Sequence, residues 1–221
     1  MKTTPDPRSS RRQLLQSLAV APMPARMVGG GAALFLSPGA SMLAATPACG
    51  AAVASTPPQT EGPYFTRNSP LRVSLVETGI PGAKLVLSGQ VLSLDCRPLP
   101  GVLLDFWQAD SEGEYDNRGY RLRGHQFTDA DGRYRLETVV PGIYPGRTRH
   151  IHVKVQAPKG PVLTTQLYLP GEARNRNDGL FAAALLVRIP DAASASWARD
   201  STRRDASEPA HASFDFAIRT A

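Results

Sequence analysis

The chain has 221 residues, 42% of them hydrophobic, which is enough for one sizeable domain with a buried core. The net charge of +6 gives no footprint for nucleic acid, because residues 1–45 carry five basic residues against one acidic residue and the remainder is nearly neutral. The 19 glycines and 20 prolines favour many short strands joined by turns over long helices.

Residues 1–45 have the features of an export leader. Arg11-Arg12 precede a small, apolar, Gly/Ala-rich stretch, which is typical of a twin-arginine signal, and we expect its removal near Ala45. The alternative is a mildly basic tail without fixed structure, because prolines interrupt the apolar region. No uninterrupted apolar run reaches about 18 residues, so we expect no stable membrane span after export. The sequence therefore predicts a periplasmic or extracellular protein.

Residues 46–83 are predicted to form an extended arm, since 46–70 is rich in turn-forming residues. The chain has two cysteines, Cys49 and Cys96. After export, a disulfide could join them and tie the mature N-terminus to the domain; the alternative is two unpaired thiols.

Residues 84–221 are predicted to form the main domain, because from Lys84 the pattern changes to short strands. Apolar alternation and turn signals predict strands at 84–94, 102–110, two within 124–142, 149–158, 162–171 and 213–220. The strand at 162–171 is the expected neighbour of that at 149–158. Two segments have other assignments: 179–190 is ambiguous between a short helix and a strand, and 198–212 is predicted to be a polar loop. Short strands at regular spacing predict an all-β fold, a β-sandwich or barrel.

His150 and His152 form a His-x-His pair on the predicted strand 149–158. Side chains at positions i and i+2 of a strand point to the same face, so the two imidazoles project side by side while Ile151 points into the core. Two imidazoles on one face are half of a metal site. The alternative is a partly exposed polar pair with no ligand role.

Two tyrosines extend this pattern into an N2O2 donor set. Tyr144 lies six residues before His150, across Pro145-Gly146, where a turn can bring the phenol back over the strand. Tyr115 lies in the loop that follows the predicted strand 102–110. Phenolate is a hard, anionic donor, which favours Fe(III) over Zn(II) or Cu(II). Taken alone, each tyrosine is equally explained as an amphipathic residue at a loop edge.

Four motifs occur in order within about residues 56–171: "TEGPYF", "DFWQADSEGEYDN", "YPGRTRHIHVKV" and "TTQLYLPG". Together they resemble the intradiol ring-cleavage dioxygenases of the protocatechuate 3,4-dioxygenase and catechol 1,2-dioxygenase type, and the third is most similar to the small exported members. The resemblance implies an all-β sandwich with an N-terminal extended arm and long loops. It also implies an enzyme that uses O2 to cleave a small aromatic diol into a muconate-type diacid.

The resemblance also implies roles for individual residues. Four donors would bind non-haem Fe(III): Tyr115, Tyr144, His150 and His152. Tyr144 would be released when substrate binds, and Arg147 would stabilise the negative charge that develops on the substrate. Gln166 would be a polar neighbour of the site. Three residues of the arm would line the substrate mouth: Thr60, Gly62 and Pro63.

Other interpretations stay open. An exported, non-enzymatic β-sandwich module that binds aromatic or carbohydrate ligands would explain the leader, the strands and the aromatic residues. A zinc-dependent hydrolase would use the His-x-His pair but lacks a third carboxylate ligand at useful spacing. Arg149 could meet a carboxylate on the substrate or face solvent, and His125 is expected at a strand edge rather than in a metal site. The sequence leaves open which catechol is the substrate and whether the chain forms a homo-oligomer.

Overall fold

The structure is a computed structural model that describes residues 54–190 and 209–221. These residues belong to the second of two compact units, Thr46–Ala221. The first unit, Met1–Ala45, contains the predicted leader and lies outside the described residues, as does Cys49, so export and the disulfide stay predictions. Within the two described ranges, no helix has the length and hydropathy needed to cross a membrane.

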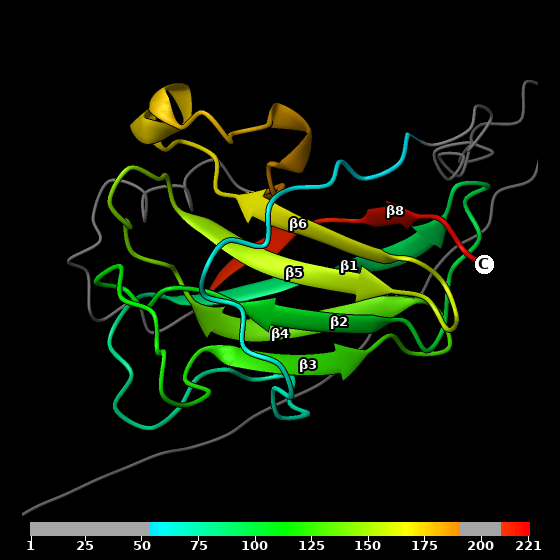
Figure 1. Ribbon diagram of the computed structural model, residues 1–221, viewed down its shortest axis with the longest axis horizontal. Helices are drawn as coiled ribbons and strands as arrows, with labels where there is room; N and C mark the ends of the chain where they lie inside the picture. The colour runs from blue at the N-terminus through cyan, green and yellow to red at the C-terminus, as the bar shows by residue number, and fades with distance from the viewer. Residues whose placement is uncertain (1–53, 191–208) are drawn as a thin grey trace, which may run out of the picture. The chain divides into compact units, whose positions relative to one another are not determined.

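The described residues form eight strands and two short 3-10 helices (Figure 1). The strands are β1 (Lys84–Ser93), β2 (Leu103–Trp107), β3 (Arg123–Phe127), β4 (Arg133–Val139), β5 (His150–Gln156), β6 (Val162–Tyr168), β7 (Ala210–Ser213) and β8 (Phe216–Ile218). The 3-10 helices are η1 (Ala173–Asn177) and η2 (Ala183–Leu185).

The strands form two sheets that pack into a sandwich. Sheet A has the order β3-β2-β5-β6 and is antiparallel throughout. Sheet B has the order β4-β1-β7, with β8 also paired to β1; β7 and β8 run parallel to β1. Residues from both sheets form one buried cluster, including Leu87 and Leu136 of sheet B and Phe106 and Val153 of sheet A. The predicted all-β sandwich is confirmed.

Three local expectations need correction or completion. The strands β3 and β4 are joined by the predicted Asp-Gly turn, but they lie in different sheets, so this turn connects the two layers. Ala210–Ser213 is strand β7, so the loop prediction for 198–212 is wrong at its end; β7 is short and polar and is extended through pairing with β1. The ambiguous segment 179–190 contains η2 and two isolated bridges rather than a regular strand.

The described part of the predicted arm, residues 54–83, crosses the outward face of sheet A (Figure 1). At the β6 edge, the Gln59 N–H donates to the Thr164 carbonyl at 2.8 Å. Over β5, the Phe65 ring lies 4.6 Å from the Lys154 ammonium. At the β3 edge, Leu71 forms an isolated bridge with His125. The arm therefore covers a face of sheet A that would otherwise meet solvent.

Candidate metal and active site

His150 and His152 project side by side from β5 toward the arm, and Ile151 between them is fully buried in the core. The two Nε2 atoms are 3.1 Å apart. Burial lowers the pKa of His150 to about 4 and the pKa of His152 well below its ordinary value. Both rings are therefore neutral at pH 7, which is the form that binds a metal ion.

The orientation of each ring is set by its neighbours. Nδ1 of His150 lies 2.7 Å from the Thr148 carbonyl, which places the proton on Nδ1 and leaves the Nε2 lone pair directed into the site. The His152 ring stacks on the Trp107 indole at 4.7 Å and 8°. Nδ1 of His152 is buried without a hydrogen-bond partner among the described residues. The site thus holds two imidazole nitrogens that face each other at close range.

Tyr115 reaches the same point from the loop after β2. Its hydroxyl lies 3.3 Å from Nε2 of His150. Burial raises the pKa of Tyr115 well above its ordinary value, so the phenol ionises only when a strongly positive group, such as a metal ion, stabilises the phenolate. The next residue, Asp116, accepts hydrogen bonds from the backbone N–H groups of Arg118, Gly119 and Arg121, which lower the pKa of Asp116 to about 2.

Tyr144 lies beside these groups but is bonded differently. Its ring centroid is 6.0 Å from that of Tyr115, and its hydroxyl shares a 2.8 Å hydrogen bond with the hydroxyl of Tyr64. The Tyr64 ring in turn stacks on Tyr115 at 4.4 Å. Tyr64 was not singled out from the sequence, although it lies in "TEGPYF" next to Pro63; only the contacts between the arm and the loops identify it.

The loops that carry Tyr115 and Tyr144 are held together at two glycines. A Cβ atom on Gly113 would lie 2.2 Å from the Ile143 carbonyl oxygen, and a Cβ on Gly142 would lie 2.2 Å from the Gly113 nitrogen. Gly113 also has a φ of +93°, which other residues rarely adopt. The close approach of the two phenols therefore depends on backbone contacts that tolerate no side chain.

Arg147, Gln166 and Thr60 form a chain of contacts beside the donors. Nη2 of Arg147 donates to Oε1 of Gln166 at 2.6 Å, and Nε2 of Gln166 donates to the Thr60 carbonyl at 2.8 Å. Gly62, at a φ of +70°, follows closely, and a Cβ there would lie 3.6 Å from Cε1 of His152. Thr60 is therefore linked to Arg147 through Gln166, and Gly62 lies against His152, whereas the side chains of Thr60 and Pro63 are solvent-exposed.

Arg149 fits neither of the two expectations for it. Its side chain is buried, with Nε 2.9 Å from Oε1 of Glu172 and Nη1 donating to the Pro141 carbonyl at 2.6 Å. It is therefore neither exposed nor available to a substrate. His125, in contrast, lies on the edge strand β3 as expected, with Nδ1 2.7 Å from the Ser69 carbonyl.

The donor spacing fits a single metal ion. Two ligands at right angles on an ion with bonds of ~2.1 Å are ~3.0 Å apart, close to the separations among Tyr115, His150 and His152. Among residues 54–190 and 209–221, no cluster of three or more His, Cys, Asp or Glu is placed to hold a metal ion. The candidate donors are phenols and imidazoles, a mixture of hard oxygen and borderline nitrogen that suits ferric iron better than zinc.

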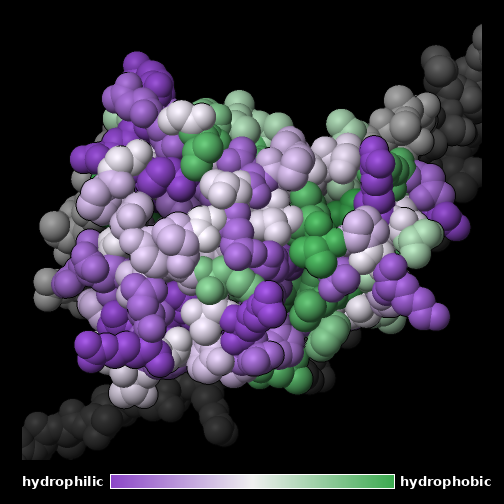
Figure 2. Space-filling model, in the orientation of Figure 1, coloured by the Kyte–Doolittle hydropathy of each residue, from purple (hydrophilic) through white to green (hydrophobic). Residues whose placement is uncertain are grey.

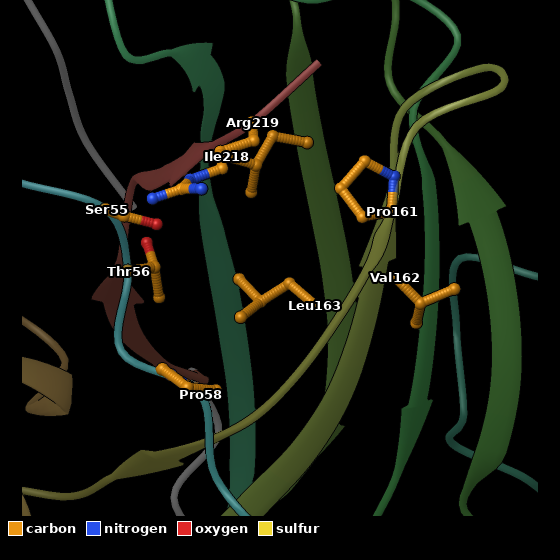
Figure 3. Close-up of a pocket in the computed structure, with 8 residues that line it drawn as sticks. All are labelled: Ser55, Thr56, Pro58, Pro161, Val162, Leu163, Ile218 and Arg219. Carbon is orange, nitrogen blue, oxygen red and sulfur yellow. The ribbon is translucent and has the colours of Figure 1, made fainter. Parts of the chain in front are cut away.

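A cavity of about 350 Å³ lies near the start of β6, apart from the candidate donors (Figure 3). Its walls come from the arm, the β5–β6 connection and the C-terminal strand: Ser55, Thr56, Pro58, Pro161, Val162, Leu163, Ile218 and Arg219. Figure 2 shows an apolar band on the side of the molecule where β6 begins and β3 ends, and the exposed side chains at those positions are Val162 and Phe127. None of the candidate donors lines this cavity.

Comparisons with known proteins find dioxygenases. The family model described as "Dioxygenase" matches residues 60–220. Among curated proteins, the chain is 32% identical over 130 residues to the protocatechuate 3,4-dioxygenase beta chain of Burkholderia cepacia, covering 50% of this chain and 55% of that one. It is 29% identical over 175 residues to catechol 1,2-dioxygenase 2 of Acinetobacter lwoffii, covering 64% of each. The alignments therefore span less than two thirds of these relatives' own length.

Solved structures share the fold. The dioxygenase domain of a dioxygenase–carbohydrate-binding protein fusion from the cellulolytic bacterium Streptomyces sp. SirexAA-E is 54% identical, with a TM-score of 0.67, and the match covers 76% of this chain and all of that domain. An intradiol ring-cleavage dioxygenase from Tetranychus urticae is 25% identical, with a TM-score of 0.63, and the match covers 76% of this chain and 95% of that one.

Proposed function

The chain belongs to the intradiol ring-cleavage dioxygenase family, and on that premise we propose that it is a non-haem Fe(III) enzyme that cleaves catechol-type rings. The cut falls between the two hydroxyl-bearing carbons, and both atoms of O2 enter the product. A catechol and one O2 together contain all the atoms of the muconate-type diacid, so no other oxidant is needed.

One observation carries this proposal: three donors from one loop and one strand meet within hydrogen-bonding distance, and a fourth donor from a second loop lies beside them. Tyr115, His150 and His152 are in direct contact, and Tyr144 adjoins Tyr115 ring to ring. A surface strand of ordinary polar residues would place none of these groups under a covering arm. The proposed ligands are therefore these four side chains.

When bound, ferric iron would hold both oxygens of the catechol and so activate its ring toward O2. The protein's own contribution begins with the neutral imidazoles of His150 and His152, which burial keeps unprotonated and ready to bind the ion. As a phenolate, the Tyr144 oxygen, which lies 2.8 Å from the Tyr64 hydroxyl, would accept one proton that a catechol releases on binding and so become a neutral phenol. Arg147 supplies a permanent positive charge next to these donors for negative charge that develops on the substrate.

The test combines colour, oxygen consumption and product. Iron-loaded protein is expected to show a visible charge-transfer band from tyrosinate to ferric iron, and to consume O2 with catechol, protocatechuate or hydroxyquinol. Resorcinol, whose hydroxyls are in a 1,3 arrangement and cannot chelate one ion, is the matched control. With ¹⁸O2, one labelled oxygen is expected in each new carboxyl group. A colourless iron-loaded protein without oxygen uptake on any catechol would favour the non-enzymatic binding module instead.

The substrate panel follows from the relatives. Relatives of this chain act on protocatechuate, catechol, 6-chlorohydroxyquinol and hydroxyquinol, as their names state. The 54% identical domain comes from a cellulolytic bacterium and is fused to a carbohydrate-binding protein. That origin supports including plant-derived, lignin-type catechols in the panel.

A homo-oligomer is also part of the proposal, and light scattering would measure the oligomeric state.

We further propose export by the twin-arginine route to the periplasm or the medium. Support comes from Arg11-Arg12 and the apolar stretch after them, all of which lie outside the described residues. Replacing both arginines by lysine is expected to retain the protein in the cytoplasm, and N-terminal sequencing of the exported form is expected to begin near Thr46. Export that is indifferent to the double substitution would contradict this route.

A further inference from the structure

We propose that Asp178 is a positioning residue that fixes the Arg147 guanidinium at the proposed site. This inference rests on the proposed function, because it concerns how Arg147 is presented to a substrate. The Asp178 side chain is 2% exposed and follows η1, on the loop after β6. Within the described residues, it forms hydrogen bonds with Arg147 and with two backbone N–H groups, and with none of the four proposed iron ligands.

The carboxylate holds Arg147 at two oxygen atoms. Nε of Arg147 donates to Oδ2 of Asp178 at 2.9 Å and to Oδ1 at 3.1 Å. Nη2 of Arg147 donates to Oε1 of Gln166. The contacts with Asp178 and Gln166 therefore use Nε and Nη2, so that the guanidinium plane cannot rotate without breaking one of them. Nη1 is the nitrogen that these two residues do not occupy.

Asp178 is itself held by backbone groups. The Thr148 N–H donates to Oδ2 at 2.9 Å, and the Leu180 N–H donates to Oδ1 at 2.9 Å. Burial alone would raise the pKa of Asp178, but these donors and Arg147 outweigh it and keep the pKa below its ordinary value. The carboxylate is therefore charged at neutral pH, and its position is set by main chain on both sides. The backbone N–H groups therefore fix the orientation of the Asp178 carboxylate, and the carboxylate fixes the orientation of the Arg147 guanidinium.

A second ion pair provides a matched control. Arg149, two residues after Arg147, pairs with Glu172, which precedes η1 as Asp178 follows it. Both pairs are largely buried and both tie η1 to the same stretch before β5. Arg149 donates to the Pro141 carbonyl, however, and makes no contact with Gln166. Loss of the Glu172 charge is therefore expected to loosen η1 without disturbing the Arg147 guanidinium.

The first experiment compares Asp178→Asn with Glu172→Gln in iron-loaded protein. Because Arg147 acts on charge that develops during the reaction, Asp178→Asn is expected to lower kcat roughly 10–100-fold with little change in KM, the range typical of residues that orient a functional group. Iron content and the resting visible band are expected to match the wild type, since no ligand is altered. Glu172→Gln is expected to leave kcat close to the wild-type value, because Gln166 is bonded by Arg147 and not by Arg149. Equal losses in both variants would assign Asp178 to loop stability only.

A double-substitution cycle tests whether Asp178 acts through Arg147. In an Arg147→Met background, Asp178→Asn is expected to lower kcat no further. Losses that multiply would overturn the inference. If Asp178→Asn does not fold, Asp178→Glu replaces it, because this variant keeps the charge but moves it by one methylene. A positioning role predicts a reduced kcat in Asp178→Glu. A role for charge alone predicts the wild-type kcat.

A readout without iron or turnover separates this inference from the proposed function. In the metal-free full chain, the Nε–H proton of Arg147 is expected to exchange slowly with solvent in nuclear magnetic resonance spectra, because it is bonded to the buried carboxylate. The exchange is expected to become fast in Asp178→Asn and to stay slow in Glu172→Gln. Slow exchange in Asp178→Asn would refute the positioning role even if the enzyme is active, and absence of oxygen uptake in the wild type would refute the dioxygenase even if the exchange result holds.

Discussion

The two sheets of the sandwich share the same inward-apolar alternation but differ in what covers their outward faces. On sheet B, the outward residues Arg133 and Arg135 are exposed to solvent. On sheet A, the arm crosses the outward face, and His150, His152 and Gln166 there are 4%, 3% and 0% exposed. Alternation in a sequence therefore identifies the face that points away from the core, but it does not reveal whether a later or earlier segment covers that face.

The difference has an energetic consequence. A polar side chain on the open face of sheet B keeps its water, whereas one under the arm loses it and must find a partner. Gln166 meets this requirement with Arg147 and the Thr60 carbonyl. The histidines meet it only in part, since Nδ1 of His152 has no partner among the described residues. Polar groups kept at such a cost on a covered face are expected to serve chemistry.

The largest expected effect comes from removing one donor on the covered face. His152→Ala takes away a proposed iron ligand, so we expect iron content to fall sharply and oxygen uptake to drop below detection, by at least about 10³-fold. The control is His211→Ala on β7, whose side chain is exposed on the outward face of sheet B and which is expected to change neither quantity. Wild-type turnover in His152→Ala would mean that the ligands are misassigned.

A smaller effect is expected where the covered face depends on backbone contact. Gly113→Ala places a Cβ 2.2 Å from the Ile143 oxygen at a φ of +93°, so the loops of Tyr115 and Tyr144 must separate. We expect a loss of about 2–4 kcal/mol in the free energy of unfolding. Gly79→Ala, at a φ of +82° with open space around it, isolates the backbone strain and is expected to cost about 1 kcal/mol. Urea denaturation measures both, and equal losses would show that the loop contact is unimportant.

A third test concerns pH and the loop of Tyr115. The hydrogen bonds to Asp116 lower its pKa to about 2, whereas the unfolded chain has an ordinary value of about 3.9. The stabilisation is therefore complete above about pH 4 and is lost as the pH falls toward 2. Comparing the free energies of unfolding of wild type and Asp116→Asn, we expect a difference at pH 6 that shrinks steadily below pH 4. A difference that is the same at pH 6 and pH 2.5 would contradict the assigned role of the carboxylate.

Local rules predicted much of this molecule, and distant contacts account for the rest. The side-by-side placement of His150 and His152 follows from the period of a strand, and the strand holding them was predicted within two residues of its observed bounds. Tyr64 and Asp178 were not singled out, because their importance comes from partners 80 and 31 residues away, Tyr144 and Arg147.

The same reason explains the errors in assignment. β7 has a short, polar sequence that reads as a loop, and only its parallel pairing with β1 makes it a strand. Arg149 looked like a residue for solvent or substrate because its partner Glu172 lies after the next strand, beyond the reach of any local pattern. At the site, the four ordered motifs predicted what local patterns could not, because they resemble a family as a set. The match of the family model to residues 60–220 shows that family.

The smallest effect is expected on the open face of sheet B, where Arg135 and Glu137 form an ion pair of 2.9 Å with both side chains about half exposed. Exposed pairs of this kind gain little Coulomb energy in water and lose side-chain freedom, so Arg135→Ala is expected to change the free energy of unfolding by less than about 0.5 kcal/mol. Added salt should reduce even this difference, because the pair is screened by counterions. Oxygen uptake should be unchanged. A loss of 2 kcal/mol or more, measured by urea denaturation at low and high salt, would show that the outward face of sheet B is also covered, either by part of the chain outside the described residues or by a second copy.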